Sequence, residues 1–410
     1  MIDPDGALPV PGLPKLAASA GRRDLAAVVA TVTAVSLPSF LVATLAVQIR
    51  GDLHFGPAIL GVVVGAASGS SALFAIPSGS LAERVGGVRT LRAAAVVAAA
   101  ALLAIALWAH SWPVLAGVLV VAGAASSAAQ TSSNLFLSRR VAAGHQGLAF
   151  GIKQSSVPLA FLLGGAAVPA IALTVGWRWA FVAAAGLALA AAAALPPSRT
   201  PLGVRLAQAA HRPRPEPAGP LIALAVGFAL ALTACSSLSA FLVSSSVAAG
   251  VGSGAAGLVA VLASLSGITV RVLTGARADR RGGRHLPAVA TMIAVGAVGF
   301  VLLAVASALR SPAILIPGAV VAFGIGWGWN GLFNFAVVRT HPLAPGRATG
   351  ITQTGGRLGS VLGPLIFGLV VSHVGYAPAW GVASGEALAG AVVIMVGRGL
   401  LQTRLAQEAR

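Results

Sequence analysis

Long apolar runs follow one another along almost the whole chain. Each is about as long as the roughly 20 residues that a helix needs to cross the hydrocarbon core of a bilayer, and Gly, Pro and Arg residues mark the boundaries. The first run is too long for a signal peptide, and many others follow it. The pattern predicts twelve spanning helices, near residues 24–49, 56–78, 91–109, 113–137, 147–173, 178–195, 220–247, 254–275, 287–308, 312–337, 347–372 and 378–397.

Composition favours a membrane protein over a soluble one. Of the 410 residues, 57% are hydrophobic and only 9% are charged, whereas about a quarter of the residues in soluble domains are charged. We therefore expect most of the surface to face the lipid bilayer. The single cysteine, Cys235, excludes disulfides and thiolate metal sites.

The basic residues indicate how the spans are oriented. With these spans, 21 of the 27 Lys and Arg residues fall on one side, and three (Arg50, Arg178 and Arg310) fall on the other. This asymmetry predicts an even number of spans with both termini in the cytoplasm. We expect a multi-pass protein of the bacterial inner (plasma) membrane. The same topology explains the net charge of +18 without nucleic acid as a partner.

The chain contains an internal repeat, because several short patterns recur in its second half at nearly one offset. They are 79–86 with 275–282, 196 positions later; Gly151 with Gly350, 199 later; and Gln130 and Asn134 with Asn330 and Asn334, 200 later. The sequence therefore predicts two six-helix bundles at 24–195 and 220–397, a cytoplasmic linker at 196–219, and cytoplasmic tails at 1–23 and 398–410.

The repeated loop carries a family resemblance. Its Gly-x-Leu-Ala-Asp-Arg-x-Gly pattern resembles the signature loop of the major facilitator superfamily, with Glu83 in place of the usual Asp in the first copy and Asp279 in the second. Six helices, a basic linker and six more helices also resemble that family. The resemblance implies an all-α membrane protein with 12 transmembrane helices in two pseudo-symmetric six-helix bundles. It further implies a secondary transporter that works by alternating access.

The resemblance also implies that the two loops stabilise the state closed to the cytoplasm. The expected gating residues are Gly79, Glu83, Arg84 and Gly86 in the first loop, and Gly275, Asp279, Arg280 and Gly282 in the second. The expected partners are Arg139 or Arg140 for Glu83, and Arg339 for Asp279. The alternative is that these are ordinary cytoplasmic loops whose acids are local counter-ions.

Two cations inside predicted spans are candidate substrate ligands. Arg357 lies near the middle of helix eleven with Gln353 one turn earlier, and Lys153 lies beside Gln154 in helix five. A charged side chain in a span usually faces a cavity or a partner, so we hypothesise that Arg357 and Lys153 attract a carboxylate of a small substrate.

Each cation has an alternative interpretation. Lys153 can extend to the cytoplasmic interface. Arg357 can pair with Glu386 in helix twelve or cap a broken backbone. A third cation, Arg271, is predicted to be a latch or interface residue rather than a ligand.

Paired amides extend the candidate site. Gln130 and Asn134 are four residues apart and share a helix face, as do Asn330 and Asn334; Trp327 joins the second pair one turn back. In the family that the chain resembles, helices one, four, seven and ten line the central cavity, which implies that these amides contact substrate or water. The alternative is hydrogen bonding between helices.

Enzyme chemistry is not expected, because the sequence has no Walker lysine motif, metal-ligand cluster or nucleophile triad. We expect no cofactor and no metal, and a monomer in the bilayer. The leading hypothesis is a carrier that imports or exchanges a small organic anion. The alternatives are an efflux carrier for hydrophobic compounds or drugs, a carrier of neutral solutes, and a non-transporting membrane sensor on a carrier scaffold. A co-transported proton and uniport both remain open, with Glu386 the only mid-span carboxylate.

Overall fold

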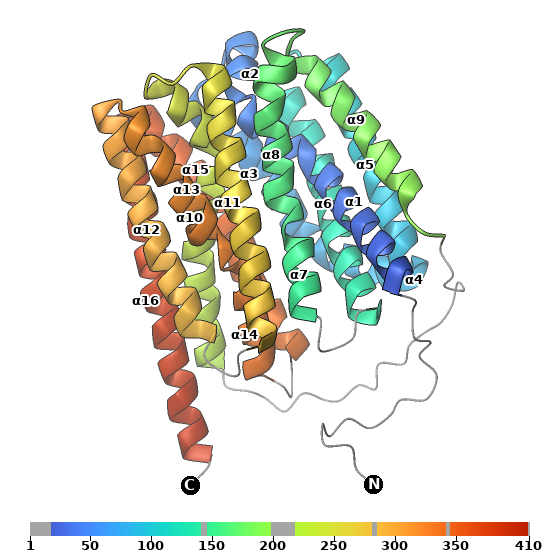
Figure 1. The fold of residues 1–410 in the computed structure, drawn as a ribbon, viewed down its shortest axis with the longest axis vertical. Coiled ribbons are helices and arrows are strands. Elements are labelled where there is room, and N and C mark those ends of the chain that lie inside the picture. Colours follow the sequence, from blue (N-terminus) through green and yellow to red (C-terminus); the bar gives the residue numbers. More distant parts are fainter. Residues whose placement is uncertain (1–17, 141–145, 198–217, 281–284, 342–344, 409–410) are drawn as a thin grey trace.

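The computed structural model describes residues 18–140, 146–197, 218–280, 285–341 and 345–408, and the elements in these ranges are all helices (Figure 1). The first half holds α1 (Ala18–Thr44), α2 (Ala46–Leu53), α3 (Pro57–Leu73), α4 (Ala75–Val85), α5 (Gly87–Trp108), α6 (Trp112–Arg140), α7 (Gln146–Gln154), α8 (Ser156–Ala167) with a π-helical turn (Val168–Ala172), and α9 (Trp177–Ala194). The second half holds α10 (Ala218–Ala248), α11 (Ser253–Arg280), α12 (His285–Leu309), α13 (Pro312–Gly328), α14 (Asn330–Thr340), α15 (Pro345–Val374) and α16 (Tyr376–Glu408).

The predicted spans are confirmed. In the described ranges, 11 helices are long and apolar enough to cross a membrane, and the number reaches 12 if the bent pair of α2 and α3 counts as one span. The second predicted span is broken rather than missing: α3 has 17 residues and passes through Phe74 into α4. Large apolar side chains such as Trp108 and Leu107 are more than half exposed, as expected for a surface that faces lipid rather than water.

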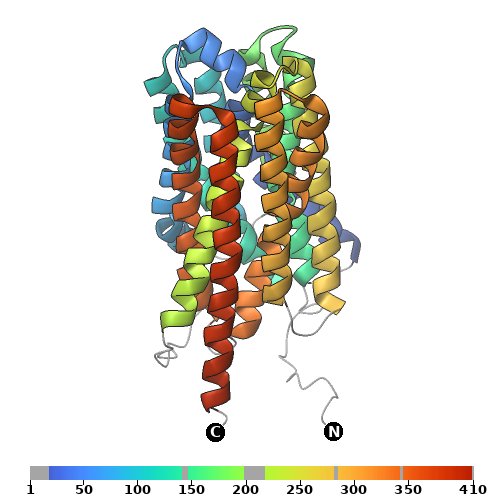
Figure 2. The same cartoon turned by 90° about the vertical axis from the view of Figure 1, so that its left-hand side faces the viewer.

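Two groups of helices lie side by side, α1 to α9 and α10 to α16 (Figure 1). The face at which α1 begins and α16 ends is called the terminal face here, and the other end of the bundle the opposite face. The last helix, α16, continues beyond 397 to Glu408 and extends past its neighbours (Figure 2). Its 33 residues make it about 50 Å long, which is longer than a bilayer core of about 30 Å.

Four turns at helix ends place glycine where φ is positive. Gly86, Gly176, Gly250 and Gly375 have φ between 87° and 101°, a region that residues with a Cβ rarely adopt. In the first copy of the signature loop, Gly86 is therefore required by the turn between α4 and α5.

The two halves meet through closely packed helices. α3 packs along α15, and α11 packs along α7 and α8. A Cβ on Gly61 would overlap the carbonyl oxygen of Pro364, and one on Gly165 would lie 2.7 Å from the carbonyl oxygen of Gly257. Small residues let helix backbones approach where the lipid offers no hydrophobic driving force. Near the opposite face the halves are therefore in backbone contact.

A second glycine row joins helices inside the second half. Gly355, Gly359 and Gly363 of α15 face the backbone of α10, and a Cβ on any of them would overlap a carbonyl oxygen there. The four-residue spacing places all three on one face of α15. These glycines therefore pack α15 against α10 and do not bind substrate.

Gly359→Ala should destabilise the protein, because the added methyl group would push α15 away from the carbonyl oxygen of Ala229. We expect the free energy of unfolding to fall by about 1–3 kcal/mol. Gly385→Ala in α16 is the matched control, since no atom lies within 4 Å of its Cβ position. Chemical unfolding in detergent measures both, and equal midpoints would contradict the packing role of Gly359.

Candidate substrate site

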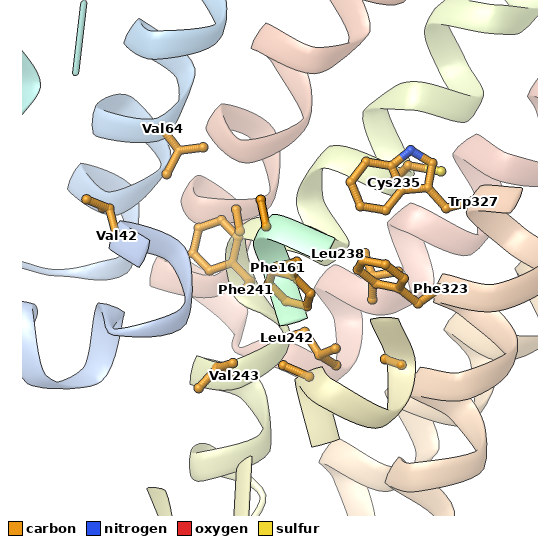
Figure 3. Close-up of a cluster of buried hydrophobic side chains, with 14 of the residues drawn as sticks. Val42, Val64, Phe161, Cys235, Leu238, Phe241, Leu242, Val243, Phe323 and Trp327 are labelled. Carbon is orange, nitrogen blue, oxygen red and sulfur yellow. The ribbon is translucent and has the colours of Figure 1, made fainter. Parts of the chain in front are cut away.

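An apolar layer closes the bundle between the two halves. It consists of Val42, Phe161, Leu238, Phe241, Leu242 and Phe323, all 2% exposed or less. Figure 3 shows these side chains gathered from α1, α8, α10 and α13. The rings of Phe161 from the first half and Phe323 from the second stack with centres 5.0 Å apart. This contact therefore seals one half against the other.

Most of the predicted polar residues lie on the terminal side of the apolar layer. Lys153 precedes Phe161 by eight residues on a span that runs away from the terminal face, and Asn330 follows Phe323 by seven on a span that runs toward it. At 1.5 Å per residue, each polar group is about 10–12 Å from the layer. Asn134 is exposed, and Gln130, Asn330 and Gln353 are partly exposed, unlike the residues of the apolar layer.

Lys153 is the most deeply buried cation of the site. Its side chain is 2% exposed, and its Nζ donates to the side-chain oxygens of Gln130 and, at 3.5 Å, Gln154. Among the described residues, no carboxylate lies within ion-pair distance of it. The ammonium group is therefore held by neutral amides of α6 and α7 rather than by a counter-ion. Lys153 does not extend to the interface, which was the alternative prediction.

The second half carries an equivalent network without a charge. Gln353 donates through Nε2 to Oδ1 of Asn334 at 2.7 Å, and Asn334 donates through Nδ2 to Oδ1 of Asn330 at 3.2 Å. The predicted amides of helices ten and eleven are therefore brought together, and α14, which holds two of them, packs against α7. At the position that the repeat pairs with Lys153, Thr352 donates to the backbone of its own helix.

Arg271 links the two halves at this level. Its side chain is 5% exposed, with Nη1 donating to the carbonyl oxygen of Gln154 at 2.6 Å and Nη2 to that of Trp327 at 3.1 Å. The guanidinium group also lies 5.3 Å from the ring centre of Trp327. Arg271 in α11 therefore connects α7 of the first half with α13 of the second.

Proline chemistry explains why Gln154 offers its carbonyl oxygen. In a continuous helix this oxygen would accept the N–H of residue 158, but residue 158 is proline and has none. Backbone groups left unpaired in a membrane must find another partner. The Arg271 guanidinium group supplies it from the other half. The prediction of Arg271 as an interface residue agrees with this contact, but its link to the predicted site was missed.

Arg357 makes a similar contact at the other interface between the halves. Its Nη1 donates to the carbonyl oxygens of Ser71 at 3.2 Å and Ala72 at 3.4 Å, in the last turn of α3. These oxygens lie just before the break at Phe74, with Pro77 in the following turn. Of the predicted alternatives, this geometry matches the cap on a broken backbone. No ion pair joins Arg357 to Glu386 in the described part of the chain.

Glu386 lies apart from the polar networks. It is half-buried in a narrow pocket between α10, α15 and α16, beside Ser237, Phe367 and Val370. That pocket contains none of the amides or cations described above.

The predicted gating contacts are largely beyond the described atoms. Glu83 and Arg84 are exposed, and Gly275 lies close to Gly151 across the interface between the halves. Arg339 is exposed, with its guanidinium group 5.4 Å from the ring centre of Phe335. Gly282 and the side chains of Arg139, Arg140, Asp279 and Arg280 lie outside the described residues, so the predicted pairs stay predictions.

Arg271→Met should destabilise the protein by about 1–3 kcal/mol, because the carbonyl oxygens of Gln154 and Trp327 would lose their donor. Pro158→Ala in the same chain should recover part of this loss, since an N–H at position 158 can bond to Gln154 within the helix. A double-mutant cycle by chemical unfolding measures the coupling. Pro317→Ala, within α13, is the control and should give no recovery. Additive effects of Arg271→Met and Pro158→Ala would contradict the freed-carbonyl explanation.

Comparisons with known proteins bear on the fold and the family. A structure of the human organic anion transporter MFSD10 (TETRAN) superposes with a TM-score of 0.67 at 18% identity, covering 91% of this chain and 99% of that one. At this identity the likeness shows the fold alone. Among curated proteins, none matches the chain.

The family is shown by a match over most of the chain. The model of the Major Facilitator Superfamily matches residues 26–364. Members are transporters rather than enzymes, and their small-molecule substrates bind within the membrane. The chain belongs to the major facilitator superfamily, as the signature loop predicted.

Proposed function

We propose that this transporter moves a small organic anion across the inner membrane by alternating access, with Lys153 as the cation that attracts the substrate's carboxylate. The observation that carries the proposal is the burial of Lys153 among neutral amides, without a carboxylate partner among the described residues. A buried charge is retained in a membrane where it pairs with something. An anionic substrate is the partner that fits.

The surrounding charges support an anion over a cation. Lys153, Arg271 and Arg357 all lie within the membrane spans, and no ion pair joins any of them to an acid in the described part of the chain. Cations with low-dielectric walls raise the local concentration of anions. Arg271 and Arg357 donate to backbone oxygens, so they contribute potential and hold the halves, while Lys153 is the candidate direct ligand.

The amides would bind the uncharged part of the substrate. Gln130 and Gln154 surround Lys153, and Asn330, Asn334 and Gln353 lie on the facing half. Amide groups both donate and accept, which suits hydroxyl, keto or carboxyl oxygens. One protein of known structure that is similar in fold is named an organic anion transporter, which is consistent with this substrate class.

We place the terminal face in the cytoplasm, because most of the basic residues lie on that side. The state described is then closed to the outside by the apolar layer and reached from the cytoplasm. Substrate exchange with the outside requires Phe161 and Phe323 to separate as the halves rock. A proton moving with the substrate is compatible with this cycle, and Glu386 is a candidate carrier of it.

Lys153→Gln should lower kcat/KM for the best organic acid roughly tenfold to a hundredfold, the effect of losing one charge-assisted hydrogen bond. Uptake of a panel of labelled acids, sugars and lipophilic drugs into proteoliposomes measures it. Lys153→Arg keeps the charge and should retain part of the activity. Gly385→Ala, remote from the site, is the control.

Three outcomes would contradict the proposal. Full transport of acids by Lys153→Gln would show that Lys153 is not the anion-binding residue. Transport of lipophilic compounds but not acids would identify an efflux carrier instead. Substrate binding without flux would identify a sensor.

A further inference from the structure

Three arginines lie on the face opposite the termini, and two of them are used in structural contacts. Arg178 pairs with Asp52 at 2.7 Å and donates to the carbonyl oxygen of Ala109 at 3.0 Å. Arg50 donates to the carbonyl oxygen of Phe55 at 3.1 Å. The third, Arg310, is exposed and has no hydrogen-bond or ion-pair partner among the described residues. The contacts that account for Arg50 and Arg178 therefore do not account for Arg310.

Arg310 lines a pocket at the opposite end of the second half. The pocket has a volume of about 230 Å³ and lies among the ends of α10, α12, α15 and α16. Its other walls include Ser245, Ser307, Val374 and Tyr376. This space suits a small ligand or the head of a larger one, since pockets for drug-sized molecules are larger, about 300–1,000 Å³.

The backbone of Arg310 is strained. Its φ is 50°, and the N–H of Ser311 bonds to the carbonyl oxygen of Ala306 at 3.0 Å, a helix ending that strongly favours glycine. Three other turns on this face place glycine at a positive φ (Gly176, Gly250 and Gly375), and a fourth places His54 there. Arg310, unlike His54, combines this strained backbone with a side chain that lines a pocket, which makes that side chain a candidate ligand.

The pocket offers hydrogen-bond donors beside the Arg310 cation. The Ser307 hydroxyl is buried without a hydrogen-bond partner in the described structure. The pocket also includes Tyr376 and Ala377, the first two residues of α16, whose N–H groups have no acceptor inside the helix. A cation, a hydroxyl group and helix N–H groups together form an environment for negatively charged oxygen atoms.

We propose that this pocket binds an oxyanion of the phosphate class, with Arg310 as its charged ligand and Ser307 as a hydroxyl donor. The site lies on the other side of the apolar layer from Lys153, so it is separate from the proposed transport site. The oxyanion can belong to free phosphate or to a lipid headgroup. Leu309 and Val374, 66% and 60% exposed, flank Arg310 and offer an apolar surface to an acyl chain.

Arg310→Gly is the decisive variant, because it removes the cation and also relieves the backbone strain. In detergent, the ligand-free variant should melt at a higher temperature than the wild type, while stabilisation by inorganic phosphate is lost. His54→Gly is the matched control: His54 is also left-handed, with φ 54°, but does not line the pocket. This control should melt higher and keep the phosphate effect.

Two arms distinguish the sources of the oxyanion. In the first, the melting temperature is titrated with inorganic phosphate in detergent; in the second, nanodiscs of phosphatidylglycerol are compared with nanodiscs of phosphatidylcholine. Whichever ligand stabilises the wild type, Arg310→Gly should lower the apparent affinity for it at least tenfold. Ser307→Ala should lower this affinity less. An effect of phosphate indicates a free anion, and an effect of phosphatidylglycerol alone indicates a lipid. Equal responses of wild type and Arg310→Gly in both arms would overturn the proposal.

Discussion

Inside a membrane, every backbone carbonyl that a helix break releases must find a donor, and this constraint organises the centre of the protein. Water is not available there to hydrogen-bond a free oxygen. Pro158 releases the carbonyl oxygen of Gln154, and the break at Phe74 exposes the last turn of α3. Arg271 and Arg357, both from the second half, donate to these oxygens of the first half. The breaks that let spans bend thus also create the polar contacts that hold the two halves in register.

Two of the three intramembrane cations are therefore explained by backbone chemistry, and Lys153 is not. Its partners are side-chain amides on its own half, which a neutral side chain could satisfy equally well. Arginine with its fixed fork suits two carbonyl oxygens, whereas a lysine ammonium is a compact charge with rotatable donors. This contrast gives the arginines a structural role and supports the proposal that the lysine binds the ligand.

Much of the fold followed from sequence, because lipid as a solvent imposes a strong pattern: run length predicted the spans, the signature loop predicted the family, and the repeat identified Gln130 and Asn330 as equivalents. The hydrogen-bond partners of individual side chains were harder to predict from the sequence. Arg357 was predicted to face substrate, but its contact depends on a helix break 286 residues away in the chain. Arg271, like Lys153, is a charged residue inside an apolar span, and Pro158 in the sequence indicates a backbone carbonyl oxygen without its helical donor. Only the packing of α11 on α7 shows that Arg271 donates to that oxygen.

The repeat also indicates how a substrate would be oriented. Gln154 and Gln353 occupy equivalent positions and both are amides, but the preceding residues differ: Lys153 carries a charge and Thr352 donates to its own helix. The two walls therefore match in hydrogen-bonding capacity and differ in charge. A ligand with one carboxylate would gain most with that group toward α7 and its uncharged end toward Asn334. If the two halves move apart for release, as proposed, a ligand held at both ends would couple its own binding to their closure.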